Sequence, residues 1–352
     1  MIERKKTRRI YVGNVSIGDG APVRVQSMTK TDTRNIQTTV KEIRRLEKAG
    51  CEIVRVAVPD ETAAKALGEI KKRIKIPLIA DIHFNYKLAV EAIAQGVDGL
   101  RINPGNIGAK WKVKEVVIAA KDRKIPIRIG VNAGSLPKDL VEKHNGPTPQ
   151  AMVEAAERHI EILEELDFHD IKVSLKASDV MKTVEAYRAF SSKYDYPLHV
   201  GITETGPIPE GVVKSSIGLG LLLLEGIGDT IRVSLTDSSV VEVDVAYEIL
   251  RVVGLRNVGV EIISCPTCGR CEVNIKKMVM QVKRALKNVK EPIKIAVMGC
   301  AVNGPGEAKE ADFGIAGGRT QGIVFAKGKI IKTVKESELV NALIEEIKKA
   351  IA

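Results

Sequence analysis

The feature that most constrains the fold is a regular alternation of short β-branched runs with longer amphipathic stretches. Stretch 40–50, for example, has helical periodicity and closes on a glycine that suits a helix C-cap. Strands that alternate with helices predict a parallel sheet, and eight such pairs in about 230 residues are typical of a (β/α)8 TIM barrel. A doubly wound open sheet is the alternative, but no G-x-G-x-x-G follows the first run. The eight runs are 23–27, 53–58, 77–83, 99–103, 126–132, 171–176, 198–204 and 230–236.

The pattern changes near Leu255, and the 352 residues are long enough for two domains. We therefore expect a barrel domain over 1–255 and a small α+β domain over 256–352. The second domain holds four of the five cysteines. We expect it to contain a basic helix (272–288), a strand (293–298), a hairpin (322–334) and a terminal helix (336–351). Within the barrel, segment 133–150 predicts a long loop that serves as a lid or binding loop.

Composition narrows the function classes. No apolar run approaches the ~20 residues of a membrane helix, and the first residues lack the apolar segment of a signal peptide, so we expect a cytoplasmic protein with reduced cysteines and no membrane partner. The net charge of +11 indicates an anionic partner, either nucleic acid or a phosphorylated small molecule. Aromatic residues make up only 3% of the chain, which argues against single-stranded nucleic acid.

Polar side chains gather where the predicted strands end, which is where barrel active sites lie. Unpaired cations are costly to bury, so their repetition predicts a cationic ring that binds a diphosphate; outward-facing ion pairs are the alternative. Glu204 is either a general acid or base or part of an ion pair, and His83 either donates a proton or orients a neighbour. Lys176 either binds phosphate or forms a Schiff base, as in an aldolase. The candidate residues are Arg55, Asp81, His83, Arg101, Asn103, Arg128, Asn132, Lys176, Glu204, Arg232 and Ser234.

The cysteines of the second domain predict a metal centre. Cys265, Cys268 and Cys271 lie in S-C-P-T-C-G-R-C, and Cys300 opens a Gly-rich segment that ends at Glu307. Zinc sites usually close with a second Cys-x2-Cys or a His pair, and this chain has no histidine after residue 199, so the spacing favours an iron–sulfur cluster over zinc. Cys271 is either a fourth ligand or a bystander. The fifth cysteine, Cys51, reads as a small buried hydrophobic residue.

Taken together, these motifs resemble the 4-hydroxy-3-methylbut-2-enyl diphosphate synthase family of the methylerythritol phosphate isoprenoid pathway, in its short two-domain bacterial form. The motifs that carry the resemblance run in order through nearly the whole chain. They are V-Q-S-M-T (25–29), C-E-I-V-R-V-A (51–57), A-D-I-H-F (80–84), L-R-I-N-P-G-N-I-G (100–108), I-R-I-G-V-N-A-G-S-L (127–136), S-L-K-A-S (174–178), G-I-T-E-T-G (201–206), S-C-P-T-C-G-R (264–270) and G-C-A-V-N-G-P-G-E (299–307).

The resemblance implies a reaction, a fold and a set of roles. The reaction is the two-electron reductive ring opening of 2-C-methyl-D-erythritol 2,4-cyclodiphosphate, with loss of water, to 4-hydroxy-3-methylbut-2-enyl diphosphate. The implied fold is a TIM barrel followed by an iron–sulfur domain resembling sulfite reductase. Glu204 would protonate the leaving hydroxyl, while Asp81 and His83 would lie at the edge of the site. The implied substrate contacts are Arg55, Arg101, Arg128, Asn132, Lys176, Arg232 and Ser234. The implied ligands of a 4Fe-4S cluster are Cys265, Cys268, Cys300 and Glu307, with Cys271 a bystander.

The resemblance also implies reduced ferredoxin or flavodoxin as electron donor, and a homodimer. Chain geometry supports the dimer separately. The eighth helix returns to the face opposite the strand ends, and the linker (254–260) is short, so each cluster domain is expected to cap the partner's barrel. Two other functions remain open at this point: a phosphosugar aldolase that uses Lys176, and a zinc-stabilised nucleic-acid-binding protein.

Overall fold

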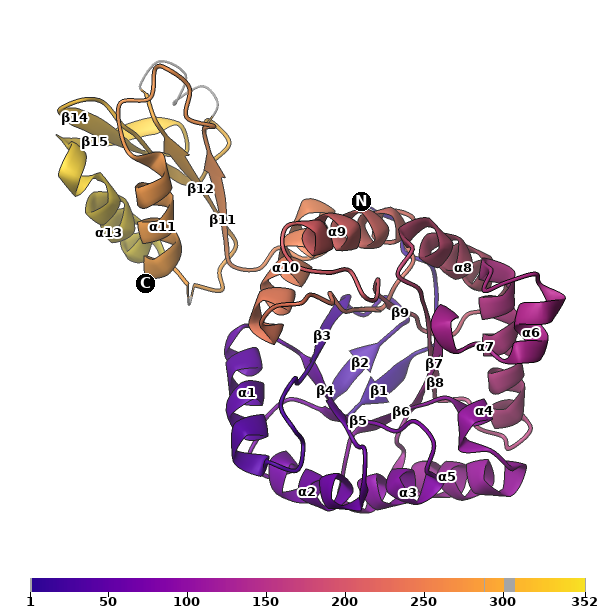
Figure 1. The fold of residues 1–352 in the computed structure, drawn as a ribbon. Coiled ribbons are helices and arrows are strands. Elements are labelled where there is room, and N and C mark those ends of the chain that lie inside the picture. Colours follow the sequence, from indigo (N-terminus) through magenta and orange to yellow (C-terminus); the bar gives the residue numbers. More distant parts are fainter. Residues whose placement is uncertain (1, 288, 301–307, 352) are drawn as a thin grey trace. The chain divides into compact units, whose positions relative to one another are not determined.

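The computed structural model describes residues 2–287, 289–300 and 308–351. The chain forms two compact units, 1–256 and 257–352, which we call the barrel unit and the C-terminal unit (Figure 1). In neither unit do the described residues form a helix with the length and apolar character that a membrane crossing requires.

Eight parallel strands form the barrel unit, which confirms the predicted TIM barrel. They pair in the order β8-β7-β6-β5-β4-β3-β10-β9, and a bridge from Val173 to Leu198 joins the two edge strands. The strands are β3 (Arg24–Met28), β4 (Ile53–Ala57), β5 (Leu78–Asp81), β6 (Gly99–Ile102), β7 (Ile127–Asn132), β8 (Ile171–Lys176), β9 (His199–Val200) and β10 (Thr230–Ile231).

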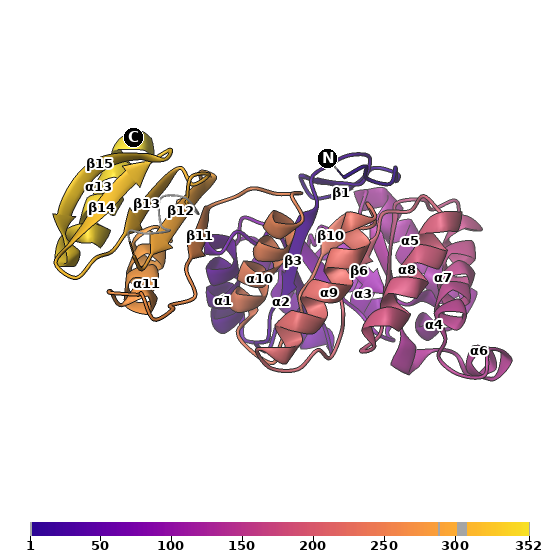
Figure 2. The same ribbon diagram turned by 90° about the horizontal axis from the view of Figure 1, so that it is seen from above.

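Helices form the outer layer around these strands (Figures 1 and 2). Several begin at a side chain that accepts a backbone N–H of the first turn, including Asp60, Thr148 and Asp179, as polar N-caps should. Segment 133–150 is not one loop, because it contains η1 (Ala133–Ser135) and α6 (Lys138–Lys143). The helices are α1 (Ile36–Lys48), α2 (Glu61–Lys71), α3 (Tyr86–Ala94), α4 (Pro104–Ile107), α5 (Lys110–Arg123), α7 (Pro149–Glu164), α8 (Val180–Lys193), α9 (Glu210–Leu224) and α10 (Ser239–Val252).

Strand alternation decides which residues enter the barrel. Successive side chains of a strand point to opposite faces, so in β4 the buried Val54 and Val56 pack toward the helices while Arg55 points into the barrel. In β7, Ile127 and Ile129 likewise join the outer core, and Arg128 lies between them. This alternation carries the cations of the strands into the interior.

A hairpin that the sequence analysis missed closes one end of the barrel. Strands β1 (Ile10–Val12) and β2 (Val15–Ile17) pair across a two-residue turn, with Gly13 at a φ of 57° that favours glycine. Its apolar side chains form a small core with Ile53 and Ile79. Because these two residues open β4 or precede Asp81 in β5, the hairpin lies at the amino-terminal end of the strands, opposite α4 and α6 (Figure 2).

The seventh and eighth strands are shorter than the predicted 198–204 and 230–236. Gly201 lies so close to the next strand that a Cβ there would be 2.5 Å from the carbonyl oxygen of Arg232. Glu204 has a φ of 54°, in the left-handed region that no strand adopts. Glu204, Arg232 and Ser234 therefore lie on loops that follow the strands.

The C-terminal unit is a five-stranded mixed sheet in the order β11-β12-β13-β14-β15. The predicted strand, hairpin and two helices are present, whereas β11 and β13 were not predicted. Both helices pack in one apolar core on the sheet, and a smaller core that contains Met298 and Phe325 lies apart from it. The elements are β11 (Val260–Ser264), α11 (Ile275–Ala285), β12 (Ile293–Met298), β13 (Phe313–Ala316), β14 (Gln321–Ala326), β15 (Lys329–Lys335), η2 (Glu336–Glu338) and α13 (Leu339–Ile351).

Candidate active site

One buried carboxylate lies among the arginines at the strand ends. Asp81 at the end of β5 is 3.4 Å (Oδ2) from Nε of Arg55 and 3.2 Å (Oδ1) from Nη1 of Arg101. His83 is half exposed, and its Nε2 is 3.8 Å from Oδ1 of Asp81. Burial alone would raise the pKa of Asp81, but Arg55, Arg101 and Arg128 outweigh burial and hold this pKa at about 2. Asp81 is therefore an anion that ties three neighbouring strands together.

The next two strands add three buried cations. Arg128 of β7 donates through Nη1 to Oγ of Ser174 (2.7 Å), and it is the ladder partner of Lys172 in β8. Lys176 lies four residues after Lys172 in β8, so it is on the same face of the strand, and its ladder partner is Asn132. Burial first, then the neighbouring guanidinium groups, lower the pKa of Arg128 and of Lys176 well below their ordinary values.

In the described parts of the chain, these cations outnumber the buried carboxylates near them. The described parts of the chain contain three buried carboxylates. Asp229 pairs with Arg4 and Glu242 with Lys30, so only Asp81 pairs with the arginines at the strand ends. Polar atoms without a hydrogen-bond partner are normally rare in a protein interior. Here they include Nε of Arg101, Nε and Nη2 of Arg128, Nζ of Lys172, Nε2 of His199 and Nε of Arg232. A cluster of unpaired cationic donors is a site for a multiply charged anion.

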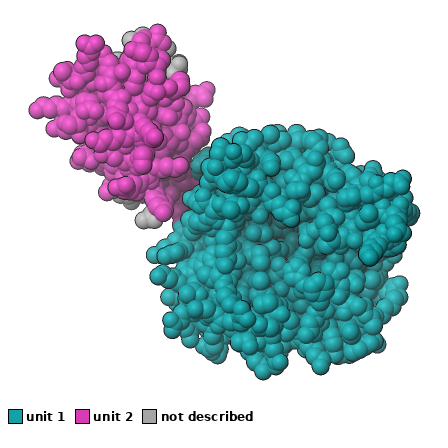
Figure 3. Space-filling model, viewed as in Figure 1, with its two compact units in different colours: residues 1–256 teal, residues 257–352 magenta. Residues whose placement is uncertain are grey.

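Two glycines make room for this cluster. A Cβ on Gly130 of β7 would overlap Nε of Arg101, and the carbonyl oxygen of Gly130 accepts from Nη2 of that arginine at 3.1 Å. A Cβ on Gly201 would be 2.8 Å from Nζ of Lys176. Figure 3 shows the barrel unit hollowed at the centre of the face in view.

The structure brings most of the predicted residues together, but not all are in contact. Asp81 contacts Arg55, Arg101 and His83, and Arg128 and Lys176 lie on the neighbouring strands β7 and β8. Asn132, Arg232 and Ser234 are half buried at the strand ends, and Asn103 is buried at the end of β6. Glu204 is exposed on the loop after β9, and it forms no ion pair with any residue in the described ranges.

Lys172, His199 and Gln26 are buried polar residues of the barrel that the sequence analysis did not select. Lys172 had a readable signal, because in I-K-V-S-L-K it shares the period-two face of Lys176. His199 is the second residue of a run already identified as a strand. Its ring accepts from or donates to Thr230 at 2.8 Å, and burial first and Lys176 second lower its pKa well below the ordinary value.

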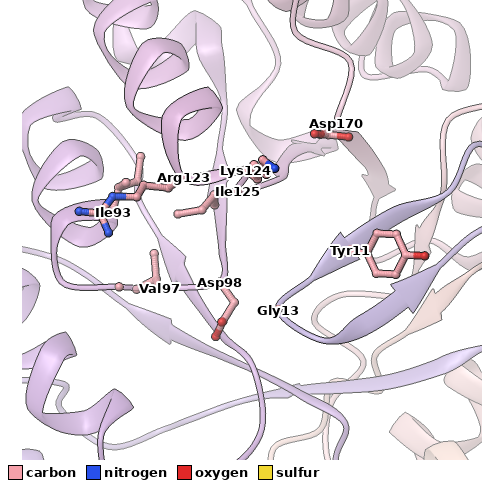
Figure 4. Close-up of a pocket in the computed structure, with 10 residues that line it drawn as sticks. Tyr11, Gly13, Ile93, Val97, Asp98, Arg123, Lys124, Ile125 and Asp170 are labelled. Carbon is pink, nitrogen blue, oxygen red and sulfur yellow. The ribbon is translucent and has the colours of Figure 1, made fainter.

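A separate pocket lies at the opposite end of the barrel (Figure 4). Its lining includes Gly13 in the hairpin turn, Asp98 before β6, Ile125 before β7 and Asp170 before β8. Asp98 already accepts from the backbone N–H of Leu78 at 2.7 Å and pairs with Lys71. This pocket is therefore distinct from the polar strand ends.

The cysteines of the C-terminal unit lie on loops that follow two neighbouring parallel strands, β11 and β12. Gly299 donates its backbone N–H to Sγ of Cys265 at 3.3 Å. A Cβ on Gly299 would lie 2.5 Å from Sγ of Cys271 and 3.2 Å from Sγ of Cys265. Only a residue without a side chain therefore leaves room for both sulfurs at this position. Cys268 is exposed, and a backbone hydrogen bond at Arg270 lowers its pKa.

Among the described side chains, no three of His, Cys, Asp or Glu are gathered closely enough to hold a metal ion. The expected ligand Glu307 lies outside the described residues, as does the rest of 301–307. The donor set nevertheless suits an iron–sulfur cluster, because two thiols of the loop after β11 lie against Gly299 of the loop after β12, and Cys300 follows this glycine in the chain. Cys271 Sγ donates to the carbonyl oxygen of Val273 at 3.2 Å, whereas Cys51 is fully buried in the barrel unit.

Comparison with known proteins covers both units. Residues 7–247 match the family model described as GcpE TIM-barrel domain, and residues 261–349 match the GcpE protein C-terminal domain. A protein of Thermodesulfovibrio yellowstonii named 4-hydroxy-3-methylbut-2-en-1-yl diphosphate synthase (flavodoxin) is 86% identical over 99% of this chain and 100% of its own length. Proteins of the same name from Lawsonia intracellularis (59% identical, 99% and 98% covered) and Geobacter sulfurreducens (56%, 99% and 99%) also match.

Two solved structures align with about 70% of this chain. A dihydropteroate synthase of Yersinia pestis aligns with a TM-score of 0.50 at 11% identity, covering 69% of this chain and 98% of its own. A type I 3-dehydroquinate dehydratase of Clostridium difficile aligns with a TM-score of 0.51 at 18% identity, covering 70% and 97%. At such identities these structures support the fold and no more. The family models and the full-length relatives show that the chain belongs to the GcpE family.

Proposed function

We propose that this chain catalyses the reductive ring opening and dehydration of 2-C-methyl-D-erythritol 2,4-cyclodiphosphate to 4-hydroxy-3-methylbut-2-enyl diphosphate. The observation that carries the proposal is the set of buried, unpaired cationic donors at the strand ends of a chain whose full-length relatives carry the synthase name. A cyclic diphosphate offers several anionic oxygens at fixed spacing, which a rigid ring of guanidinium groups can bind.

The residues divide into anion binders and a proton donor. Arg55, Arg101, Arg128, Lys176 and Arg232 neutralise the diphosphate, and Asn132 and Ser234 add hydrogen bonds at the rim. Asp81 holds Arg55 and Arg101 in place between neighbouring strands, and His83 lies at the outer edge of this group. Since the arginines are positioned before any ligand arrives, little free energy is lost in ordering them.

Glu204 protonates the leaving hydroxyl in this proposal. Its left-handed φ is unfavourable for a residue with a side chain, and such conformations are concentrated at functional sites. Its side chain is exposed to solvent on the loop after β9.

A 4Fe-4S cluster fits the C-terminal unit, with Cys265, Cys268, Cys300 and Glu307 as its ligands. When bound there, the cluster would supply electrons one at a time. By the family pattern, Cys271 is proposed to stay outside the ligand set; its Sγ lies 3.2 Å from the carbonyl oxygen of Val273. Flavodoxin, which the relatives' names contain, or ferredoxin is the proposed electron donor.

The proposed homodimer follows from where the chain leaves the barrel. Arg256 donates through Nη1 to the carbonyl oxygen of Val23 (2.9 Å), just before β3, so the chain leaves at the amino-terminal end, away from the polar strand ends. Helix α9 also presents Val213, Ile217 and Leu224, each more than half exposed, along one side. Such a stripe is typical of an interface. Antiparallel pairing of two α9 helices would set the chain exit of one barrel beside the strand ends of its partner.

Subunit complementation tests this arrangement. Arg128→Met and Cys265→Ser should each be inactive alone. If each cluster caps the partner's barrel, co-assembled subunits recover about a quarter of wild-type activity, because half of the dimers are mixed and each mixed dimer has one intact site. Recovery should fail with Ile217→Glu in both chains. No recovery without that substitution would show that each cluster serves its own barrel.

The reaction is tested with anaerobically purified protein, a reduced viologen dye and the cyclic diphosphate. Substrate-dependent oxidation of the dye, with formation of the linear alcohol diphosphate, is the expected result. Arg128→Met should abolish it, while Arg123→Met, on the opposite end of the barrel, should leave it unchanged. An iron-containing protein that ignores this substrate would refute the assignment, and borohydride trapping of a carbonyl substrate on Lys176 would favour an aldolase instead.

A further inference from the structure

Helix α11 carries the most one-sided charge of the C-terminal unit. Five exposed cations lie on it or just after it, and the exposed side chain of Met280 lies among them. The spacing of Lys276, Met280, Lys283 and Lys287 is that of one helical face. We call this surface the α11 basic face, made of Lys276, Lys277, Met280, Lys283, Arg284 and Lys287.

Within the described ranges, the cations of this face form no ion pair. No carboxylate in the described ranges lies within ion-pair distance of any of them, and 275–287 contains no acidic residue. The nearby Glu272 is already paired with Arg319 at 3.3 Å. By contrast, Glu346 on the neighbouring α13 pairs with Lys349 at 2.8 Å. The α11 basic face therefore has charge available for a partner.

The face lies beside the cysteine loops. The first residue of helix α11, Ile275, is four residues after Cys271. The N-cap residue Asn274 accepts a hydrogen bond from the backbone N–H of Lys277. Its buried side, with Met278 and Val282, belongs to the same apolar core against which Cys265 and Cys271 pack. The cysteine loop is itself exposed from Pro266 to Arg270. A protein bound on the first turns of α11 would thus be held next to the thiols.

The composition of the face fits a transient protein contact. An adaptable apolar residue ringed by charges is the usual anatomy of a small interface, and methionine is enriched there. Complementary charge raises the rate of encounter, which suits a carrier that must dock and leave in every cycle. The face has no aromatic side chain on which nucleic-acid bases could stack.

We propose that the α11 basic face is the docking surface for an acidic one-electron carrier protein, which reaches the cysteine-bound cluster from this side. The proposal rests on the proposed function, since it needs a redox centre on the cysteines. Each docking event oxidises the carrier by one electron and reduces the enzyme by one, so one turnover requires two events.

The test uses flavodoxin as the probe and the cluster-loaded enzyme. The test variant is Lys276→Glu/Lys283→Glu/Lys287→Glu. The matched control, Lys327→Glu/Lys329→Glu/Lys335→Glu, changes the net charge equally at the opposite edge of the sheet, where these lysines are exposed and form no ion pair with described residues. Binding of flavodoxin is measured by titration calorimetry at low and high salt, and turnover is measured with both flavodoxin and reduced viologen.

The test variant should bind flavodoxin roughly tenfold or more weakly at low salt, lose most of its salt dependence and keep its viologen-driven turnover. The control should bind like the wild type. Equal weakening in both variants, or none in the test variant, would overturn the docking surface. A wild type that binds flavodoxin through this face, yet fails to turn over the cyclic diphosphate with viologen, would instead refute the proposed function and leave the docking surface standing.

Discussion

Replacing Lys172 by methionine should stabilise the barrel, and the gain should depend on pH. Lys172 is fully buried in β8, and its Nζ has no hydrogen-bond partner among the described residues. Burial first, and the guanidinium of Arg128 second, lower its pKa to about 7, although Asp229 acts in the opposite direction. The barrel therefore holds an ammonium group where the charged form is disfavoured.

The sign and size of the effect follow from proton linkage. In the unfolded chain a lysine titrates near 10.4, so below pH 7 both states carry the charge and the folded state bears the full cost. Each pH unit between the two pKa values is worth about 1.4 kcal/mol, which puts that cost at about 3–5 kcal/mol. Between pH 7 and 10 the unfolded chain binds one more proton than the folded one, so the cost falls as pH rises, and it vanishes above the unfolded pKa.

The assay is denaturant unfolding followed by the fluorescence of Trp111, the one tryptophan of the chain, which lies on α5 in the barrel unit. At pH 6, Lys172→Met should unfold with a free energy about 3–5 kcal/mol above that of the wild type, and the two should converge near pH 10. Lys172→Arg keeps the charge at every pH and should show no gain. A methionine variant that is less stable at pH 6, or equally more stable at all pH values, would refute the reasoning.

The same variant should separate stability from anion binding. The unpaired donors of Arg128 lie beside Lys172 on the neighbouring strand, so an anion bound there gains from a second positive charge. We expect Lys172→Met to bind inorganic diphosphate more weakly than the wild type while unfolding at higher denaturant. Such an exchange of stability for function is common where a site must hold like charges together.

Three further variants test the geometry of the two sites. Asp81→Asn removes a carboxylate whose pKa of about 2 lies below its unfolded value, so it should lower the free energy of unfolding by about 3 kcal/mol at pH 7, and denaturation profiles should show the difference vanish as pH falls from 4 to 2. Gly130→Ala should displace Arg101 and raise the KM for the cyclic diphosphate at least as much as it lowers kcat. An unchanged KM would contradict the role of Gly130 in making room for Arg101. Gly299→Ala should press on the thiol of Cys271 and lower the iron content on analysis, with the barrel's unfolding midpoint unchanged.

The sequence predicted the barrel because most of its strands are apolar runs, interrupted mainly by side chains that point inward. Ser27 of β3 is an exception, because it donates to Glu242 of α10. The sequence predicted the positions of the arginines for the same reason, since a cation inside such a run faces the interior. It overestimated the seventh and eighth strands, because the close approach at Gly201 and the left-handed backbone of Glu204 depend on tertiary contacts. The strand β13 was missed because it has four residues and contains Gly314, whose place is set by the ring of Phe325.

The site residues show a similar division. Arg55 and Arg128 could be selected because each is the one charged residue in an otherwise apolar run. Lys172 shares its strand with Lys176, and only the structure shows that both are buried on the interior side. The pairing of Asp81 with two arginines depends on the register between strands, and so does the lack of a carboxylate within ion-pair distance of Arg128 among the described residues. The register between strands cannot be predicted from a single sequence until the turns and the barrel closure are known.

The hairpin β1–β2, which the sequence analysis missed, compensates for the polar side chains in the barrel interior. A barrel interior is ordinarily packed with branched apolar side chains, but here the interior near the carboxyl ends of the strands is occupied by Arg55, Arg101, Arg128 and two lysines. The apolar residues that remain on the strands, such as Ile53 and Ile79, lie near the amino-terminal end and could not form a core alone. The hairpin supplies Ile10, Val12 and Ile17 from outside the strands and completes that core. The polar side chains at the carboxyl ends of the strands thus leave few apolar side chains for the barrel interior, and the two short N-terminal strands add apolar side chains at the amino-terminal end.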